Sequence, residues 1–264
     1  MSPRRPPRAW IGRPLSTDPS ELIGPRGLTA EVLAEAVEPE AATLSRGADD
    51  GAPTGDAAFY WSLFTPERKA RIETVVASRL RSLTVVLDRL LDAHNTAAIF
   101  RTAEGLGLST AHVVLHESDD GIAHRRVTQD AHKWIDVDRH ETGVACARAL
   151  REKGFEVWAG HLDDNAILYG ELPRDRPLAL LFGNEHEGPS RETLSACTGT
   201  FRIPMAGFTQ SFNVSVAAGI ALAHAAQARR AFLHAPGDLD DDEQALLKSR
   251  FTLLAAKLSR RLKR

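Results

Sequence analysis

Residues 201–220, FRIPMAGFTQSFNVSVAAGI, join a short apolar strand to the start of a helix rich in small residues. Pro204 ends the strand, because proline lacks the N–H that a strand ladder needs. The loop then offers the Ser211 hydroxyl, the Asn213 amide and backbone N–H groups where the helix begins. Such a loop can hold a polar ligand or an anion, although it is also compatible with an ordinary strand–loop–helix connection.

The same alternation of strands and helices continues along the chain before this stretch. Leu83–Leu87 and Pro177–Phe182 are continuous apolar runs, typical of strands buried in a parallel sheet. Strands that alternate with helices from 83 to 230 predict an α/β fold with a mainly parallel sheet. Further strands are expected at 111–115, 135–137, 155–159 and 201–203, and helices at 96–105, 140–153, 191–196 and 213–233.

Two loops between these elements concentrate glycine and polar residues. Residues 183–188 (GNEHEG) and 204–215 both follow predicted strands. Ligands of such sheets bind beyond the carboxyl ends of the strands, so we expect the two loops to share one site. The GNEHEG loop lacks the glycine patterns of phosphate-binding loops, and the carboxylates of Glu185 and Glu187 would repel phosphate. It suits a neutral or positive ligand such as a nucleoside, or else it is a simple turn.

Extensions flank the predicted α/β domain, which we assign to residues 83–233. Residues 1–56 are rich in Pro, Gly, Ala and Arg and are expected to be a flexible extension, either a variable tail or a basic arm for RNA. Thr65 and Pro66 form a helix start, and a basic N-terminal helix is expected over 57–82. A C-terminal basic helix is expected within 238–264, after an acidic linker that begins at Asp238.

The composition limits the class of protein. The chain has 264 residues, a net charge of −2 and 43% hydrophobic residues, which suffices for one large domain with a core. Basic residues gather near both ends, and local patches of this kind can bind nucleic acid. Cys146 and Cys197 make no disulfide framework, which favours a reducing cytoplasm. No apolar run reaches the roughly 18 residues of a membrane span, and the Arg-rich start lacks the apolar segment of a signal peptide.

Arg101 draws attention because it lies inside an otherwise apolar helix, six residues after Asn95. A guanidinium matches phosphate with a bidentate fork and is rarely buried without a partner. The alternative is a structural salt bridge with Glu104 or Glu185. The residue types alone leave these two interpretations open.

Two other kinds of site receive little support. His132, His140, His161 and His186 form no HxH or HxxxH pair, so no metal is expected. Ser211 lies in no GxSxG elbow, so the sequence does not indicate a hydrolase triad.

Three segments together resemble the three motifs of the SpoU/TrmH family of RNA ribose 2′-O-methyltransferases, within the SPOUT class. They are NTAAIFRTAE at 95–104, LLFGNEHEG at 180–188, and IPMAG at 203–207 followed by QSFNVSVAA at 210–218. Their order and spacing fit the family over about residues 65–230. The resemblance implies a C-terminal trefoil knot in the α/β domain, S-adenosylmethionine as methyl donor without a metal, and an obligate homodimer that completes the site.

The resemblance also assigns roles to individual residues. Asn95 and Arg101 match the first motif, in which the Arg is the catalytic residue near the ribose 2′-OH and its phosphate. Glu185, Ser211 and Asn213 match the polar residues of the cofactor and substrate pocket. Two positions depart from the family pattern, with Phe in place of the usual Leu at 212 and Gly in place of a common Thr at 160. The cofactor-binding positions would be Gly160, Leu162, Gly183, Asn184, Gly188, Ile203, Met205 and Phe212.

Within the family, the chain is most similar to the tRNA type that methylates the D-loop guanosine, nucleotide 18 in tRNA numbering. The basic helix that starts at Thr65, the HKW triplet at 132–134 and the terminal basic helix carry this likeness. The alternatives are methylation of rRNA or of another tRNA nucleotide, a non-catalytic RNA-binding paralogue and, more distantly, a metabolic α/β enzyme. RNA contacts are expected from Arg68, Arg71, Lys133, Arg229 and Arg230.

Overall fold

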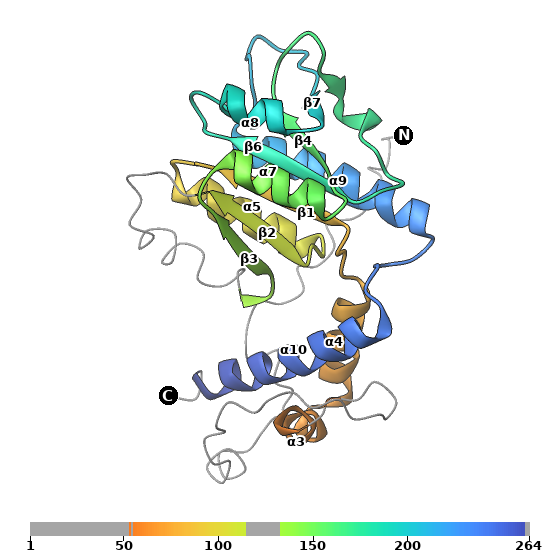
Figure 1. Cartoon of the computed structure of the whole chain (residues 1–264). Coiled ribbons are helices and arrows are strands. Elements are labelled where there is room, and N and C mark those ends of the chain that lie inside the picture. The colour runs from red at the N-terminus through yellow and green to blue at the C-terminus, as the bar shows by residue number, and fades with distance from the viewer. Residues whose placement is uncertain (1–52, 54, 115–132, 262–264) are drawn as a thin grey trace, which may run out of the picture. The chain divides into compact units, whose positions relative to one another are not determined.

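The computed structural model describes residue 53 and residues 55–114 and 133–261. The chain forms two units, one of residues 77–240 and the other of residues 1–76 together with 241–264 (Figure 1). Most of the predicted extension at 1–56 lies outside the described residues, as do residues 115–132, which include the first residue of the HKW triplet.

The unit of residues 77–240 contains a seven-stranded sheet in which every neighbouring pair is parallel. The order across the sheet is β3-β2-β1-β6-β4-β7-β5. This confirms the predicted α/β fold with a parallel sheet. The strands are β1 (Leu83–Asp88), β2 (Thr110–Val114), β3 (Asp136–His140), β4 (Glu156–Gly160), β5 (Ile167–Leu168), β6 (Leu178–Gly183) and β7 (Gly199–Arg202).

In the described residues of this unit, helices cover both faces of the sheet (Figure 1). Helices α5 (Ala93–Gly105) and α9 (Val214–Leu233) pack on one face, where Leu87 and Leu180 join Ile99 and Ala221 in a buried core. Helices α7 (Gly143–Glu152) and α8 (Arg191–Ala196) pack on the other face, over a second core. All six residues of both β1 and β6 are buried, as a strand covered on both faces requires.

Some element boundaries differ from the expected ones. The strand expected at 135–137 runs to His140, so the next helix begins only at Gly143, where the Thr142 hydroxyl accepts a hydrogen bond from the N–H of Ala145. The short strand β5 and the 3₁₀ helix η2 (Tyr169–Glu171) were not expected, because neither shows a periodic pattern.

The segment expected as one basic helix over 57–82 contains two helices, α3 (Asp56–Leu63) and α4 (Pro66–Ala77). The break falls at Thr65 because the residue before a proline is disfavoured in helical conformation. The Thr65 hydroxyl accepts a hydrogen bond from the N–H of Arg68, which confirms the predicted helix start.

In the same unit, α10 (Asp241–Arg261) packs on α3 and buries Phe251 and Ala255. It begins inside the segment expected as an acidic linker. Asp241, Asp242 and Glu243 form its first turn, where carboxylates favour the positive end of the helix dipole.

In the part of the chain that the structure describes, no helix combines the length and apolar character of a membrane span. The trefoil knot implied by the family resemblance stays a prediction.

Candidate active site

The three motif segments meet at the carboxyl edge of the sheet. Asn95 lies in the first turn of α5, just after β1, while Glu185 follows β6 and Asn213 precedes α9. The Asn95 amide nitrogen donates to the Glu185 carboxylate at 2.9 Å. The Asn213 amide nitrogen donates to the side-chain oxygen Oδ1 of Asn95 at 3.0 Å. One chain of hydrogen bonds therefore joins residues from all three motifs, as the prediction of a shared site requires.

The residues at both ends of this series of hydrogen bonds, Glu185 and Asn213, also bond to backbone groups. Glu185 also accepts hydrogen bonds from the N–H groups of Leu91 and Asp92, at 2.9 and 3.2 Å. Asn213 is the N-cap of α9, and its oxygen accepts from the N–H and the hydroxyl of Ser215. The side chains are thus held in fixed positions before any ligand binds.

The environment of Glu185 favours its charged form. Partial burial raises the pKa of its carboxyl group, but the hydrogen bonds from Asn95, Leu91 and Asp92 outweigh it and hold the pKa below the ordinary value. An ionised Glu185 can accept hydrogen bonds but cannot donate one, so it serves to orient donors.

Arg101 is exposed on α5 and forms no hydrogen bond or ion pair within the described residues. Glu104 is paired with Arg79 at 2.8 Å, and Glu185 is bound to Asn95. The alternative of a structural salt bridge with either acid is therefore wrong for Arg101. Its guanidinium remains available to a ligand from solution.

The loop after β6 has a shape that requires glycine at one position and favours it at a second. A Cβ on Gly183 would overlap the backbone of Pro189 and Gly188, and Gly188 has a positive φ of 68°. Asn184 closes the loop, since its oxygen accepts from the N–H groups of His186 and Glu187. The Asn184 amide nitrogen donates to the carbonyl of Arg89, and the Asn184 backbone C=O accepts from the N–H of Gly188. A cofactor contact at Asn184 stays a prediction.

The predicted cofactor positions lie at or after the ends of three neighbouring strands. Gly160 ends β4 and Leu162 follows it, Gly183 ends β6 and Asn184 and Gly188 follow it, and Ile203 to Phe212 follow β7. The backbone of residues 203–212 makes no hydrogen bond to other backbone of the described residues, which leaves its N–H and C=O groups for a ligand. Leu162 and Phe212 are 60% and 39% exposed and add apolar surface. These features fit a nucleoside that is bound largely through backbone groups.

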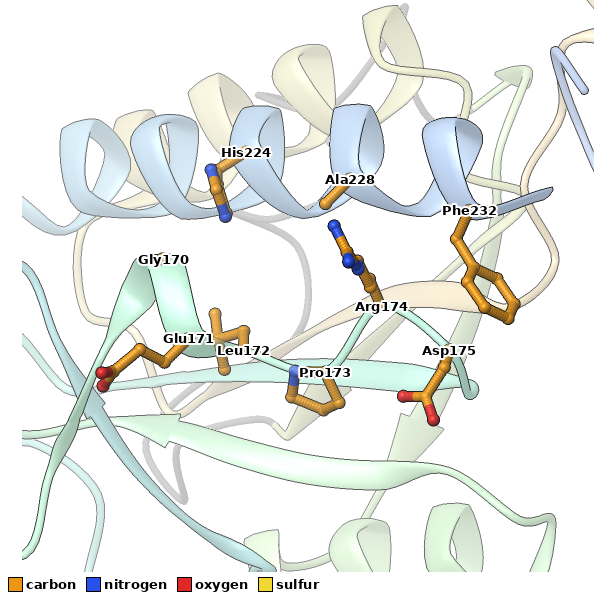
Figure 2. Close-up of a pocket in the computed structure, with 9 residues that line it drawn as sticks. All are labelled: Gly170, Glu171, Leu172, Pro173, Arg174, Asp175, His224, Ala228 and Phe232. Carbon is orange, nitrogen blue, oxygen red and sulfur yellow. The ribbon is translucent and has the colours of Figure 1, made fainter. Parts of the chain in front are cut away.

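Figure 2 shows a cavity of about 550 Å³ elsewhere on the same unit, between α9 and the segment around η2. Arg174 points toward α9 there, near Ala228 and Phe232. The cavity contains none of the predicted catalytic or cofactor residues, so it is not the candidate active site. Its lining is Gly170, Glu171, Leu172, Pro173, Arg174, Asp175, His224, Ala228 and Phe232.

Several predicted RNA-binding cations use their donors inside the protein. Arg68 stacks on Phe64 and donates to the carbonyl of Ala255 at 3.0 Å. Arg230 donates to the carbonyls of Ser78, Leu106 and Pro236. Arg229 donates to the carbonyl of Arg174 and to the hydroxyl of Ser82. Arg71 and Lys133 are half-buried. RNA contact by these five residues stays a prediction.

The two backbone N–H groups that orient Glu185, those of Leu91 and Asp92, were not among the expected site groups. The polar turn that starts at Asp92 marks their position in the sequence, but backbone donors leave no residue signature. Ser211, which was expected, is exposed and forms no hydrogen bond within the described residues.

Comparisons with known proteins show the family of the chain. The model of the SpoU rRNA Methylase family matches residues 82–223. A tRNA (guanosine(18)-2′-O)-methyltransferase of Thermus thermophilus is 37% identical over 166 residues, which cover 62% of this chain and 84% of that protein. The one from Escherichia coli K12 is 34% identical over 168 residues, 62% of this chain and 72% of the relative.

Solved structures give the same result. The Aquifex aeolicus TrmH/SpoU tRNA modifying enzyme superimposes with a TM-score of 0.63 at 28% identity, over 71% of this chain and 96% of that one. An AdoMet-bound rRNA methyltransferase from Sinorhizobium meliloti superimposes with a TM-score of 0.50 at 30% identity, over 59% of each chain. A parallel α/β sheet with three linked motifs at its carboxyl edge, together with these likenesses, defines an RNA methyltransferase of the SPOUT class. The chain belongs to the SpoU rRNA methylase family, whose model matches more than half of its length.

Proposed function

We propose that this protein transfers a methyl group from S-adenosylmethionine to the ribose 2′-OH of the D-loop guanosine, nucleotide 18, of tRNA. The observation that carries the proposal is the hydrogen-bonded link of Glu185, Asn95 and Asn213, with an unoccupied Arg101 on the same helix as Asn95. The relatives that act on guanosine 18 of tRNA support this substrate.

The backbone of 160–162, 183–188 and 203–212 is the proposed cradle for S-adenosylmethionine. When bound there, S-adenosylmethionine supplies an electrophilic methyl group on a sulfonium. The apolar side chains of Leu162 and Phe212 suit its adenine, and the available N–H and C=O groups of 203–212 suit its polar atoms.

Arg101 has the properties of the residue that positions the reacting ribose. A guanidinium does not lose its proton in proteins, so it is a poor general base. It can instead hold the phosphate beside the ribose in a bidentate pair, and a phosphate oxygen can then accept the 2′-OH proton. The same positive charge stabilises the alkoxide that develops as the oxygen attacks.

A homodimer and a cytoplasmic location belong to the same proposal. Phe208, Phe212 and Val216 are exposed apolar side chains next to the site, with Phe208 fully exposed. A second copy of the chain would cover this surface and close the site against water. A tRNA substrate would place the protein in the cytoplasm.

The experiment that tests the proposal is methyl transfer from labelled S-adenosylmethionine to tRNA transcripts, with mass-spectrometric mapping of the modified nucleoside. We expect 2′-O-methylguanosine at nucleotide 18, and no label in a transcript with adenosine at that position. Label in that control transcript would overturn the assignment of the nucleotide. Cofactor binding without transfer to any RNA would favour a non-catalytic RNA-binding paralogue.

A second candidate is methylation of rRNA. A Burkholderia 23S rRNA (guanosine-2′-O-)-methyltransferase is 37% identical over 158 residues, which supports this alternative. Ribosomal RNA included in the same assay separates the two, because label confined to rRNA would keep the chemistry and change the substrate.

A further inference from the structure

A cluster of side chains of metal-ligating type lies on the α7 face of the sheet and uses no residue of the three motifs. His112 is on β2, His140 ends β3, and Cys146 is in the first half of α7. One ligand atom from each of these three residues lies within 4.8 Å of the other two. Nδ1 of His112 is 3.1 Å from Nε2 of His140.

The sheet register explains why these residues meet. β2 and β3 are parallel neighbours, with His112 opposite Asp138 and Val114 opposite His140. Side chains two residues apart in a strand point to the same face, so Asp138 and His140 share the face of His112. Oδ2 of Asp138 lies 3.7 Å from Nδ1 of His112. Figure 1 shows β3 at the edge of the sheet, beside β2.

We propose that His112, His140, Cys146 and Asp138 bind a divalent transition-metal ion, with Zn²⁺ as the ion that this donor set suits best. Two imidazoles, one thiolate and one carboxylate match the nitrogen, sulfur and oxygen ligands of zinc. Ligand atoms of a tetrahedral zinc lie about 3.3–3.6 Å apart, given bonds of about 2.0–2.3 Å. The ligand atoms of His112, His140 and Cys146 already lie within 4.8 Å of one another. Asp138, whose Oδ2 is 3.7 Å from Nδ1 of His112, is outside this group and would have to move closer to the other two residues to complete the set.

The protonation states of His112 and Cys146 are compatible with binding of a metal ion. Burial lowers the pKa of His112 to about 4, so its imidazole is neutral, which is the form that ligates a metal. Burial raises the pKa of the Cys146 thiol to about 12, so the ion displaces this proton when it binds. His140 and Asp138 reach the surface and provide a path of entry, since the Asp138 side chain is 49% exposed.

Such an ion would tie the edge strand β3 to β2 and α7. It would have no part in methyl transfer, because none of its ligands belongs to the linked motif residues. The role of the site is therefore stabilisation of the sheet edge, and the expected consequence of metal binding is a higher melting temperature.

The test uses the full-length protein, stripped with a chelator and titrated with Co²⁺ alone and then with Zn²⁺ alone. We expect one ion per chain, a thiolate-to-cobalt charge-transfer band, the visible bands of tetrahedral cobalt, and a rise in melting temperature with either ion. Failure to bind an ion at one per chain would overturn the proposal and leave a hydrogen-bonded histidine pair beside an ordinary buried thiol.

Variants locate the ion. Cys146→Ser should abolish the charge-transfer band, while Cys197→Ser, the matched control at the other buried cysteine, should keep it. His140→Ala changes a half-buried edge residue, so it should fold even if Cys146→Ser does not. It should weaken Co²⁺ binding by more than the roughly 10–100-fold expected for loss of a group that only supports a ligand. Unchanged Co²⁺ affinity in His140→Ala would refute the site.

Discussion

Replacement of Asn95 by Ala removes the side chain that links the three motifs. Asn95 is 8% exposed, and its amide both donates to Glu185 and accepts from Asn213. The change therefore deletes two hydrogen bonds and leaves a donor on Asn213 and a carboxylate oxygen on Glu185 each short of one partner. We expect losses in both stability and turnover.

The expected loss of stability in Asn95→Ala follows from the two hydrogen bonds that the change removes. A hydrogen bond to a charged group contributes about 1.5–3 kcal/mol and a neutral one about 0.5–1.5 kcal/mol. Glu185 is half-buried and Asn213 is exposed, so water replaces part of what is lost. We expect the free energy of unfolding to fall by about 2 kcal/mol. A displacement of catalytic groups by about 1 Å can lower turnover about 100-fold, and we expect a loss in kcat/KM of this order.

Urea unfolding and single-turnover methyl transfer measure the two effects. Gln227→Ala is the matched control, because it removes an exposed amide from α9 that makes no hydrogen bond within the described residues. If Asn95→Ala matched this control in both assays, the link would not organise the site. Lower stability with normal turnover would assign Asn95 a structural role only.

Three further predictions concern other residues. Arg101→Ala should abolish methyl transfer and leave S-adenosylmethionine affinity nearly unchanged in calorimetry; loss of cofactor binding would instead make Arg101 structural. Glu185→Gln should lower the stability of the protein at neutral pH. A carboxyl group whose pKa is lowered by folding contributes stability at neutral pH and loses this contribution as the pH falls through its lowered pKa, so the difference from the unaltered protein should shrink in acid. Melting curves across the acid range check this, and a constant difference would contradict it. Phe251→Ala, at a side chain 2% exposed in α10, should destabilise its unit by about 3–5 kcal/mol in calorimetry, and an unchanged melting profile would refute that role.

Much of the fold and the core of the site could be predicted from the sequence. The apolar runs at 83–87 and 177–182 identify the central strands because a strand covered on both faces is continuously apolar. The motif residues Asn95, Glu185 and Asn213 are polar residues that follow strands, or precede a helix, in a fixed order. Their direct hydrogen bonds could not be predicted, since these depend on side-chain conformations.

The positions of basic residues in the sequence predicted function less well than the polar residues of the loops did. Arg68 and Arg230 have the same sequence appearance as exposed cations, yet their guanidinium groups donate to main-chain carbonyls. The histidine spacing likewise gave no sign of the cluster of His112, His140 and Cys146, because strand register and helix packing, rather than sequence distance, bring these residues together. The start of α4 was predicted from Thr65 and Pro66, but the separate helix α3 before it was not.

The hydrogen-bonded link has a consequence for the order of folding. Asn95 and Glu185 are 90 residues apart, and Asn95 and Asn213 are 118 apart. A chain that is still being synthesised has no complete site until α9 has emerged and docked, since such long-range contacts form late. Truncated or half-folded chains therefore cannot modify RNA. In a refolding experiment, the return of methyl transfer should follow the slowest phase rather than the return of helical signal.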